Sequence, residues 1–200
     1  MTRSSGILLA GGAARRFGRP KHIALVDGMP LFHLPLVALR GACDEVLVVI
    51  APDAPEPGLP AGVTNVRYAR DGAPHEGPLS GAVAGLLGAT GDDAAIAGAD
   101  MPGLTASLVE LMLGEARRRA RAVTLGDGRD APPLPAVVPV DRAREVGQLV
   151  YGRGERRLRA LMTALEAVIL PKDIWSSADP EGAWRQDVDT PGDLPSRSGR

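Results

Sequence analysis

The sequence has little of the material that builds disulfides, cysteine-based metal sites or membrane spans. Its 200 residues include one cysteine, Cys43, which excludes an internal disulfide and argues against a cysteine metal cluster. We expect Cys43 to be a reduced, partly buried thiol. The first residues lack the apolar run of a secretion signal, and no apolar stretch is long enough to cross a bilayer. We therefore expect a cytoplasmic protein that does not contact membranes.

Aromatic residues and net charge are also scarce. Aromatics make up 3% of the chain, so the core must consist mainly of Ala, Val and Leu. The 23 Lys and Arg residues nearly cancel the 24 Asp and Glu residues, leaving a formal charge of -1, which argues against a nucleic-acid partner. The length suits one domain with a substantial core. We expect this domain to span residues 1–195, followed by a disordered tail at 196–200.

Short apolar runs alternate with helical patterns along the chain. Strands are expected at residues 6–10, 45–51, 64–69, 94–97, 122–125, 136–140 and 168–170. Helices are expected at residues 30–40, 78–87, 142–151 and 155–164, with one more that starts after Thr105 as its N-cap. Residues 171–185 look irregular, and Trp175 and Trp184 are expected to cover an edge of the core. This alternation predicts a Rossmann-like three-layer α/β fold, with a mostly parallel sheet that includes an antiparallel strand.

The segment LLAGGAARRFGRPK, residues 8–21, joins the first expected strand to a basic loop. It matches neither the Walker loop nor the dinucleotide-binding fingerprint, because its glycines are wrongly spaced for both. Gly11 and Gly12 would let a ligand approach the backbone N–H groups. Cations follow at Arg15, Arg16, Arg19 and Lys21. Such a loop could grip the phosphates of a nucleotide, although a strand-to-helix turn with solvated basic residues explains it equally well.

Two further loops follow expected strands and carry carboxylates. In GADMPGL, Asp100 comes directly after a strand, where it could bind Mg²⁺ or only cap a turn. In RDGAPHEGPLSG, Asp71 precedes a helix start that contains Gly77, Pro78 and Gly81. Small residues there would let a sugar or base lie against the backbone, although close helix–sheet packing has the same requirement. Because ligands of such folds bind beyond the carboxyl ends of the strands, both loops are candidates for one site.

The end of the chain offers a third acidic motif. DVDTPGDL contains Asp187 and Asp189, and Asp189 could be a second metal ligand or the cap of a final turn at Pro191. Upstream, GRGERRLRAL contains Arg156 and Arg157, which could grip an anionic substrate or only pair with acidic neighbours.

Together these loops resemble the nucleotidyltransferases of the molybdenum cofactor guanylyltransferase family. That family opens with Leu-Ala-Gly-Gly-x3-Arg-Met-Gly-x-x-Lys, and here residues 9–12, Arg16-Phe17-Gly18 and Lys21 occupy those positions. Its Gly-Pro-Leu-x-Gly motif matches residues 77–81, its Asp-x-Pro matches residues 100–102, and its Gly-Glu-Arg-Arg segment matches residues 154–157. The closing Asn/Asp-x-Asn/Asp-Thr-Pro matches residues 187–191. The matches occur in order over nearly the whole chain.

The resemblance implies transfer of GMP from GTP to the phosphate of molybdopterin cofactor, with release of pyrophosphate. Lys21 and Arg16, with the backbone of Gly11 and Gly12, would then hold the triphosphate, and Asp100 would hold Mg²⁺ against it. The nucleoside would contact Asp71, and the backbones of Leu9 and Ala10 would line the base pocket. The second substrate would be gripped by Arg156 and Arg157. Transient contact with cofactor-delivering proteins or molybdoenzymes is a further expectation.

The chain departs from the family pattern in two ways that bear on the substrate. It lacks the asparagine that the family commonly carries near the end of the strand at residues 48–51. Asp189 stands where guanylyl members often carry Asn, as in cytidylyl relatives. Against that, cytidylyl relatives tend to read Leu-Ala-Ala-Gly in the first loop, whereas this chain has Gly11, which favours guanine.

Other functions remain possible at this point. They are transfer of CMP to the same cofactor, transfer of a nucleotide to a sugar phosphate, and a non-catalytic binding or chaperone role. The last is disfavoured because Lys21 and Asp100 are both present. A nicotinamide oxidoreductase is disfavoured by the missing dinucleotide fingerprint.

Overall fold

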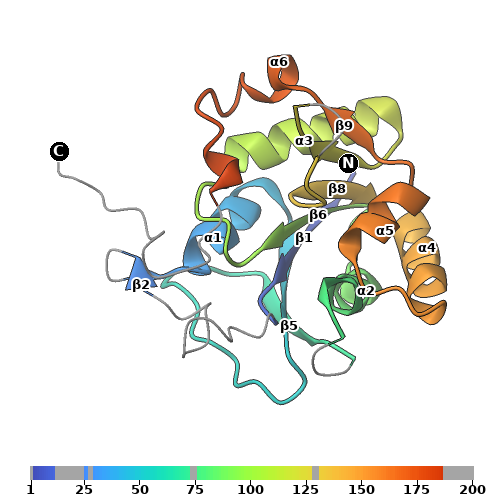
Figure 1. The fold of residues 1–200 in the computed structure, drawn as a ribbon. Coiled ribbons are helices and arrows are strands. Elements are labelled where there is room, and N and C mark those ends of the chain that lie inside the picture. The colour runs from blue at the N-terminus through green and yellow to red at the C-terminus, as the bar shows by residue number, and fades with distance from the viewer. Residues whose placement is uncertain (1, 12–24, 27–28, 73–75, 128–130, 187–200) are drawn as a thin grey trace, which may run out of the picture.

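The structure is a computed structural model that describes residues 2–11, 25–26, 29–72, 76–127 and 131–186. Its centre is a seven-stranded sheet with the order β5-β4-β1-β6-β8-β7-β9 (Figure 1). The strands are β1 (Ser4–Leu9), β4 (Glu45–Ile50), β5 (Val66–Arg70), β6 (Asp93–Gly98), β7 (Val123–Leu125), β8 (Ala136–Pro139) and β9 (Val168–Leu170). Only β8 runs antiparallel to its neighbours in this sheet. The predicted mostly parallel sheet with an antiparallel strand is confirmed.

Helices cover both faces of this sheet, as the three-layer prediction requires (Figure 1). One apolar core lies between the sheet and the helices α1 (His33–Ala42) and α3 (Ala106–Arg119). The other lies beneath α2 (Pro78–Gly88), α4 (Val140–Gly152) and α5 (Leu158–Ala164). All six residues of β4, EVLVVI, are buried, because a central parallel strand is covered on both faces.

The helix starts follow local chemistry, with one correction. The predicted cap at Thr105 is confirmed, because its side chain accepts a hydrogen bond from the Leu108 amide at 3.3 Å. The prediction that Pro30 opens a helix is wrong. Pro30 belongs to β3 (Met29–Pro30), which pairs with β2 (Leu25–Val26), and α1 begins at His33. Pro35 lies in the first turn of α1. Backbone N–H groups there have no acceptor within the helix, so proline, which lacks an N–H, is tolerated.

The segment after β9 is more ordered than the sequence suggests. It contains α6 (Lys172–Trp175) and a 3₁₀ turn at Ala183–Arg185. Its two tryptophans are not at the edge of the core but within it, since Trp175 is 0% and Trp184 is 1% exposed. The prediction of irregular structure is therefore wrong for Lys172–Trp175 and Ala183–Arg185. The predicted tail at 196–200 lies outside the described residues.

Two expectations from composition can be compared with the structure. Cys43 is buried at the end of α1, and this burial raises the pKa of its thiol to about 12. The thiol is therefore protonated at neutral pH, and it is buried more deeply than the expected partly buried position. In the part of the chain that the structure describes, no helix has the length and hydropathy needed to cross a membrane.

Candidate nucleotide-binding site

Four parallel strands, β5, β4, β1 and β6, end at the same edge of the sheet, and backbone hydrogen bonds tie their ends together. The Ala10 amide donates to the Val49 carbonyl at 2.8 Å, and the Ala99 amide donates to the Leu9 carbonyl at 3.0 Å. The Asp71 amide donates to the Ile50 carbonyl at 2.9 Å. These bonds extend the sheet one residue past the strands, so the predicted site residues start from a rigid frame.

The predicted nucleoside residues Leu9, Asp71 and Gly81 lie together at this edge. A methyl group added at Gly81 would lie 3.6 Å from Asp71 Oδ2 and 3.6 Å from Leu9 Cδ2. Asp71 is oriented by the hydroxyl of Ser80, which donates to Asp71 Oδ1. Ser80 is 4% exposed. Hence one oxygen of Asp71 is used within the protein, and the other faces the side of α2 where Gly81 leaves room.

Ser80 has no role in the sequence-based predictions, although it lies within a predicted motif. The signal was present, since Ser80 occupies the variable position of the Gly-Pro-Leu-x-Gly motif, on the first turn of a helix. A hydroxyl there can reach a carboxylate on the neighbouring strand. What the sequence could not supply is the pairing of this helix with the end of β5.

The start of α2 needs glycine at position 77. Gly77 has φ 87° and ψ 172°, a backbone region that only glycine adopts readily. A Cβ there would also lie 2.8 Å from the carbonyl oxygen of Arg156. Pro78 follows as the first residue of the helix, where proline is well tolerated. The predicted glycine–proline turn is thus fixed by both conformation and packing.

The predicted acceptor residues Arg156 and Arg157 lie on the segment that packs against this turn. The Leu79 amide donates to the Arg156 carbonyl at 3.2 Å. The Arg156 guanidinium lies 4.4 Å from the centroid of the Tyr151 ring and 3.5 Å from Glu76 Oε2. Arg157, with a side chain 82% exposed, pairs with Glu155. Both arginines thus have acidic partners, and their role in acceptor binding stays a prediction.

Asp100 follows β6 in a turn, at the same edge as Leu9. A Cβ on Gly98 would lie 2.4 Å from Asp100 Oδ1, so the glycine makes room for the carboxylate. The described residues contain no group of three or more His, Cys, Asp or Glu side chains that could hold a metal ion. One carboxylate in such a recess suits Mg²⁺, which often takes one or two protein carboxylates and completes its shell with phosphate oxygens and water.

Several predicted site residues lie outside the described part of the chain. These are Gly12, Arg16, Lys21 and Asp189. The structure therefore brings together Leu9, Ala10, Gly11, Asp71 and Gly81, with Asp100 on the adjoining strand end. The triphosphate-binding cations and the second metal ligand stay predictions.

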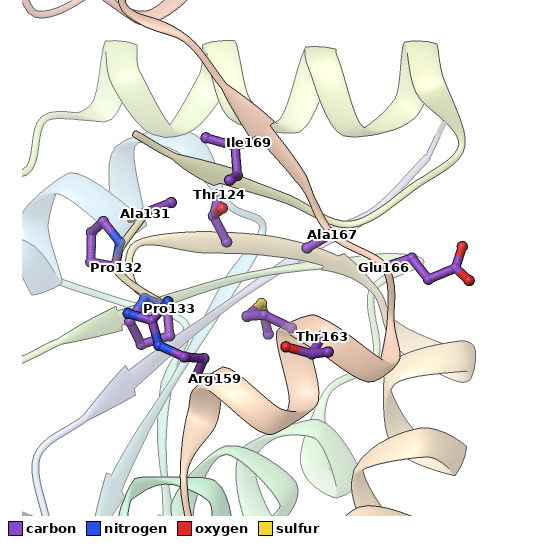
Figure 2. A pocket seen from close by; sticks show the side chains of 10 residues that line it. Thr124, Ala131, Pro132, Pro133, Arg159, Thr163, Glu166, Ala167 and Ile169 are labelled. Atoms are coloured by element: carbon purple, nitrogen blue, oxygen red, sulfur yellow. The ribbon is translucent and has the colours of Figure 1, made fainter. Parts of the chain in front are cut away.

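A separate cavity of about 200 Å³ lies between α5 and the sheet strands β7 and β9. Figure 2 shows Arg159 and Thr163 of α5 on one side of it, with Thr124 and Ile169 opposite. Pro132 and neighbouring residues close one end. None of the predicted site residues in the described ranges lines this cavity, so it is distinct from the edge that carries Asp71 and Asp100.

The sheet order and the shared strand ends define an open α/β protein, a class in which ligands bind beyond the carboxyl ends of the strands. A family model described as the MobA-like NTP transferase domain matches residues 6–168, well over half of the chain. The chain therefore belongs to the MobA-like NTP transferase family.

Relatives agree with this membership. A probable molybdenum cofactor guanylyltransferase of Chloroflexus aggregans is 31% identical over 201 residues, covering 95% of this chain and 91% of its own. A protein of the same description from Mycobacterium tuberculosis is 37% identical over 170 residues, covering 82% and 81%.

The fold itself has close counterparts among solved structures. The molybdopterin-guanine dinucleotide biosynthesis protein A of Archaeoglobus fulgidus superposes with a TM-score of 0.76 at 20% identity, over 95% of this chain and 94% of that one.

Proposed function

We propose that this protein transfers GMP from GTP to the terminal phosphate of molybdopterin cofactor and releases pyrophosphate. The observation that carries the proposal is the meeting of Leu9, Asp71 and Gly81 beside Asp100 at one edge of the sheet. It is supported by two curated relatives, each above 30% identity, whose descriptions name a probable molybdenum cofactor guanylyltransferase.

The chemistry asks for positioning and charge neutralisation rather than for a proton acceptor. The nucleophile is an oxygen of the acceptor phosphate, already anionic near neutral pH. It forms a bond to the α-phosphorus of GTP while the bond from that phosphorus to the bridging oxygen breaks, and pyrophosphate leaves. Holding the two anions in line is then the protein's main task.

Each predicted residue has a place in this scheme. Asp71, oriented by Ser80, accepts hydrogen bonds from the nucleoside next to Gly81. The backbone of Leu9, Ala10 and Gly11 contacts the base. Lys21 and Arg16 hold the triphosphate together with the backbone of Gly12, and Arg156 and Arg157 bind the acceptor.

Mg²⁺ is proposed as the cofactor, held by Asp100, with Asp189 as a candidate second ligand. Bound there, it would supply positive charge to the phosphate oxygens. The space beside Gly98 leaves room for the Asp100 carboxylate at the end of β6, next to the end of β1.

The choice of GTP rests on Gly11 in the Leu-Ala-Gly-Gly loop. A cytidylyltransferase for the same cofactor is the second candidate, favoured by Asp189. We would measure Mg²⁺-dependent binding of GTP, CTP and ATP to the full chain by titration calorimetry. GTP should bind at least about tenfold more tightly than CTP, a difference of about 1.4 kcal/mol. Binding of CTP alone would replace the guanylyl assignment by the cytidylyl one.

A further inference from the structure

The segment that follows β9, residues 171–186, lies beyond the region that the family model matches. It nevertheless contains both tryptophans of the chain, and both are buried. Figure 1 shows this red and orange segment passing over α3 and then turning back toward α1. Such a large buried area in an otherwise aromatic-poor protein indicates that the segment is docked firmly.

Arg185 and the two tryptophans form a compact cluster, which we call the tryptophan clasp. The Arg185 guanidinium carbon lies 4.5 Å from the Trp175 ring centroid and 4.8 Å from that of Trp184. The same guanidinium pairs with Asp127, just past β7. Trp175 Nε1 donates to the Gly126 carbonyl at 3.2 Å. The clasp therefore fixes the segment to the carboxyl end of β7.

The clasp also holds the segment against the turn that carries Asp100. A Cβ at Gly103 would lie 1.9 Å from the Ala183 carbonyl oxygen, so the two backbones are in direct contact. Met101 and Leu104 of the same turn are each 4% exposed and belong to the core that contains both tryptophans. The 3₁₀ turn thus forms one wall of the Asp100 turn.

The 3₁₀ turn is itself held by a buried carboxylate. Asp179 is 6% exposed, and its Oδ2 accepts a hydrogen bond from the Trp184 amide at 2.9 Å. The Asp100 turn has two internal backbone bonds, from the Met101 amide to the Gly98 carbonyl at 3.4 Å and from the Leu104 amide to the Met101 carbonyl at 3.2 Å. Because Gly103 of this turn lies directly against the Ala183 carbonyl, the position of the 3₁₀ turn bears on the geometry of the Asp100 turn.

We propose that the tryptophan clasp positions the Asp100 carboxylate for binding Mg²⁺, with Gly103 and Arg185 as positioning residues. The inference rests on the proposed role of Asp100 in the function above. Gly103 allows the contact, and Arg185 keeps Ala183 in place. Loss of either would leave Asp100 present but displaced, and displacements of about 1 Å can cost a reaction about 100-fold.

Gly103→Ala tests the contact, and Gly114→Ala on α3 is the matched control. The φ of Gly103 lies outside the left-handed region, so the methyl group acts through its clash with Ala183 alone, whereas a Cβ at Gly114 meets nothing within 4 Å. For Gly103→Ala we expect kcat to fall about tenfold or more and the half-saturating Mg²⁺ concentration to rise. Gly114→Ala should match the wild type. Unchanged kcat and Mg²⁺ dependence in Gly103→Ala would overturn the proposal.

Arg185→Gln provides a second variant that leaves the Asp100 turn itself unaltered. Removing the stacked cation should shift the tryptophan emission and accelerate amide hydrogen exchange in residues 98–104. Arg185→Lys keeps the positive charge but loses the planar stacking. It should therefore give smaller changes in tryptophan emission and in amide exchange. This exchange measurement needs no substrate, so it also decides the matter if the wild type transfers no GMP. Wild-type exchange in residues 98–104 of both Gly103→Ala and Arg185→Gln would contradict the clasp whatever the reaction proves to be.

Discussion

Two glycines of the same motif should respond in opposite ways to one added methyl group. At Gly81 the methyl has ordinary space within the protein, and it replaces a helix-interior glycine, which favours folding by about 1 kcal/mol. The methyl would fill the space between Leu9 and Asp71. An extra methyl in a binding pocket changes the binding free energy of a ligand by about 1–3 kcal/mol. We therefore predict that Gly81→Ala raises the melting temperature yet weakens nucleotide binding about tenfold or more.

Gly77→Ala is the counterpart of that variant. Its positive φ and the 2.8 Å approach to the Arg156 carbonyl both penalise a side chain, at a cost of about 1–3 kcal/mol for the backbone conformation alone. Thermal unfolding of both variants, with nucleotide titration of each, checks the pair. A stable Gly77→Ala, or a Gly81→Ala that binds GTP normally, would contradict this reading of the motif.

Gly11 is the residue on which the choice of base depends. A Cβ there would approach the Ala51 backbone nitrogen at 3.4 Å and the Ile50 carbonyl carbon at 3.6 Å, which the fold can accommodate. We predict that Gly11→Ala folds normally and lowers the preference for GTP over CTP. Competition between the two nucleotides in transfer assays measures this ratio. An unchanged ratio would remove Gly11 as the specificity residue.

At the scale of elements, Glu45 joins the amino ends of the strands opposite the site. Burial alone would raise the pKa of this carboxyl, but hydrogen bonds from Arg67, Thr90 and Ser5 outweigh it and lower the pKa to about 2. A group whose pKa is depressed by folding stabilises the native state above its unfolded pKa. That stability is lost as the pH falls through the folded pKa.

The consequence is a pH-dependent stability between about pH 4.5 and pH 2. Glu45 should contribute on the order of 3 kcal/mol at neutral pH, and this contribution should decline across that interval. Glu45→Gln should be less stable at pH 7 and should lose less stability on acidification. Urea unfolding of both proteins from pH 7 to pH 3 provides the comparison. Parallel pH profiles would show that Glu45 is not the responsible group.

The sequence predicts elements well where the pattern is long and poorly where it is short. The run at Glu45–Ile50 and the cap at Thr105 follow from local chemistry, and both appear as predicted. The structure of residues 171–186 could not be predicted from the sequence. A single helical turn and a single 3₁₀ turn are too short to show a hydrophobic periodicity. Likewise, the pairing of Arg156 with Glu76 joins residues 80 positions apart, and only the folded sheet brings them together.

At the scale of the whole molecule, the antiparallel β8 separates two parts of one sheet. The parallel strands β5, β4, β1 and β6 lead to the predicted nucleotide residues at their carboxyl ends. The clasp follows β9 and contacts Gly126 and Asp127, just past β7. Asp100, at the end of β6, lies where these two parts meet. The site residues lie far apart in the sequence, so the parallel topology, and not any single motif, gathers them.

The most direct test of this account is transfer from α-labelled GTP to molybdopterin cofactor in the presence of Mg²⁺, with wild type and Asp100→Ala assayed side by side. Circular dichroism and thermal unfolding should establish that the variant is folded. The wild type should form a guanylylated cofactor and one pyrophosphate per product, and Asp100→Ala should form neither. Equal turnover by the folded Asp100→Ala variant, or product formation only from CTP, would contradict it.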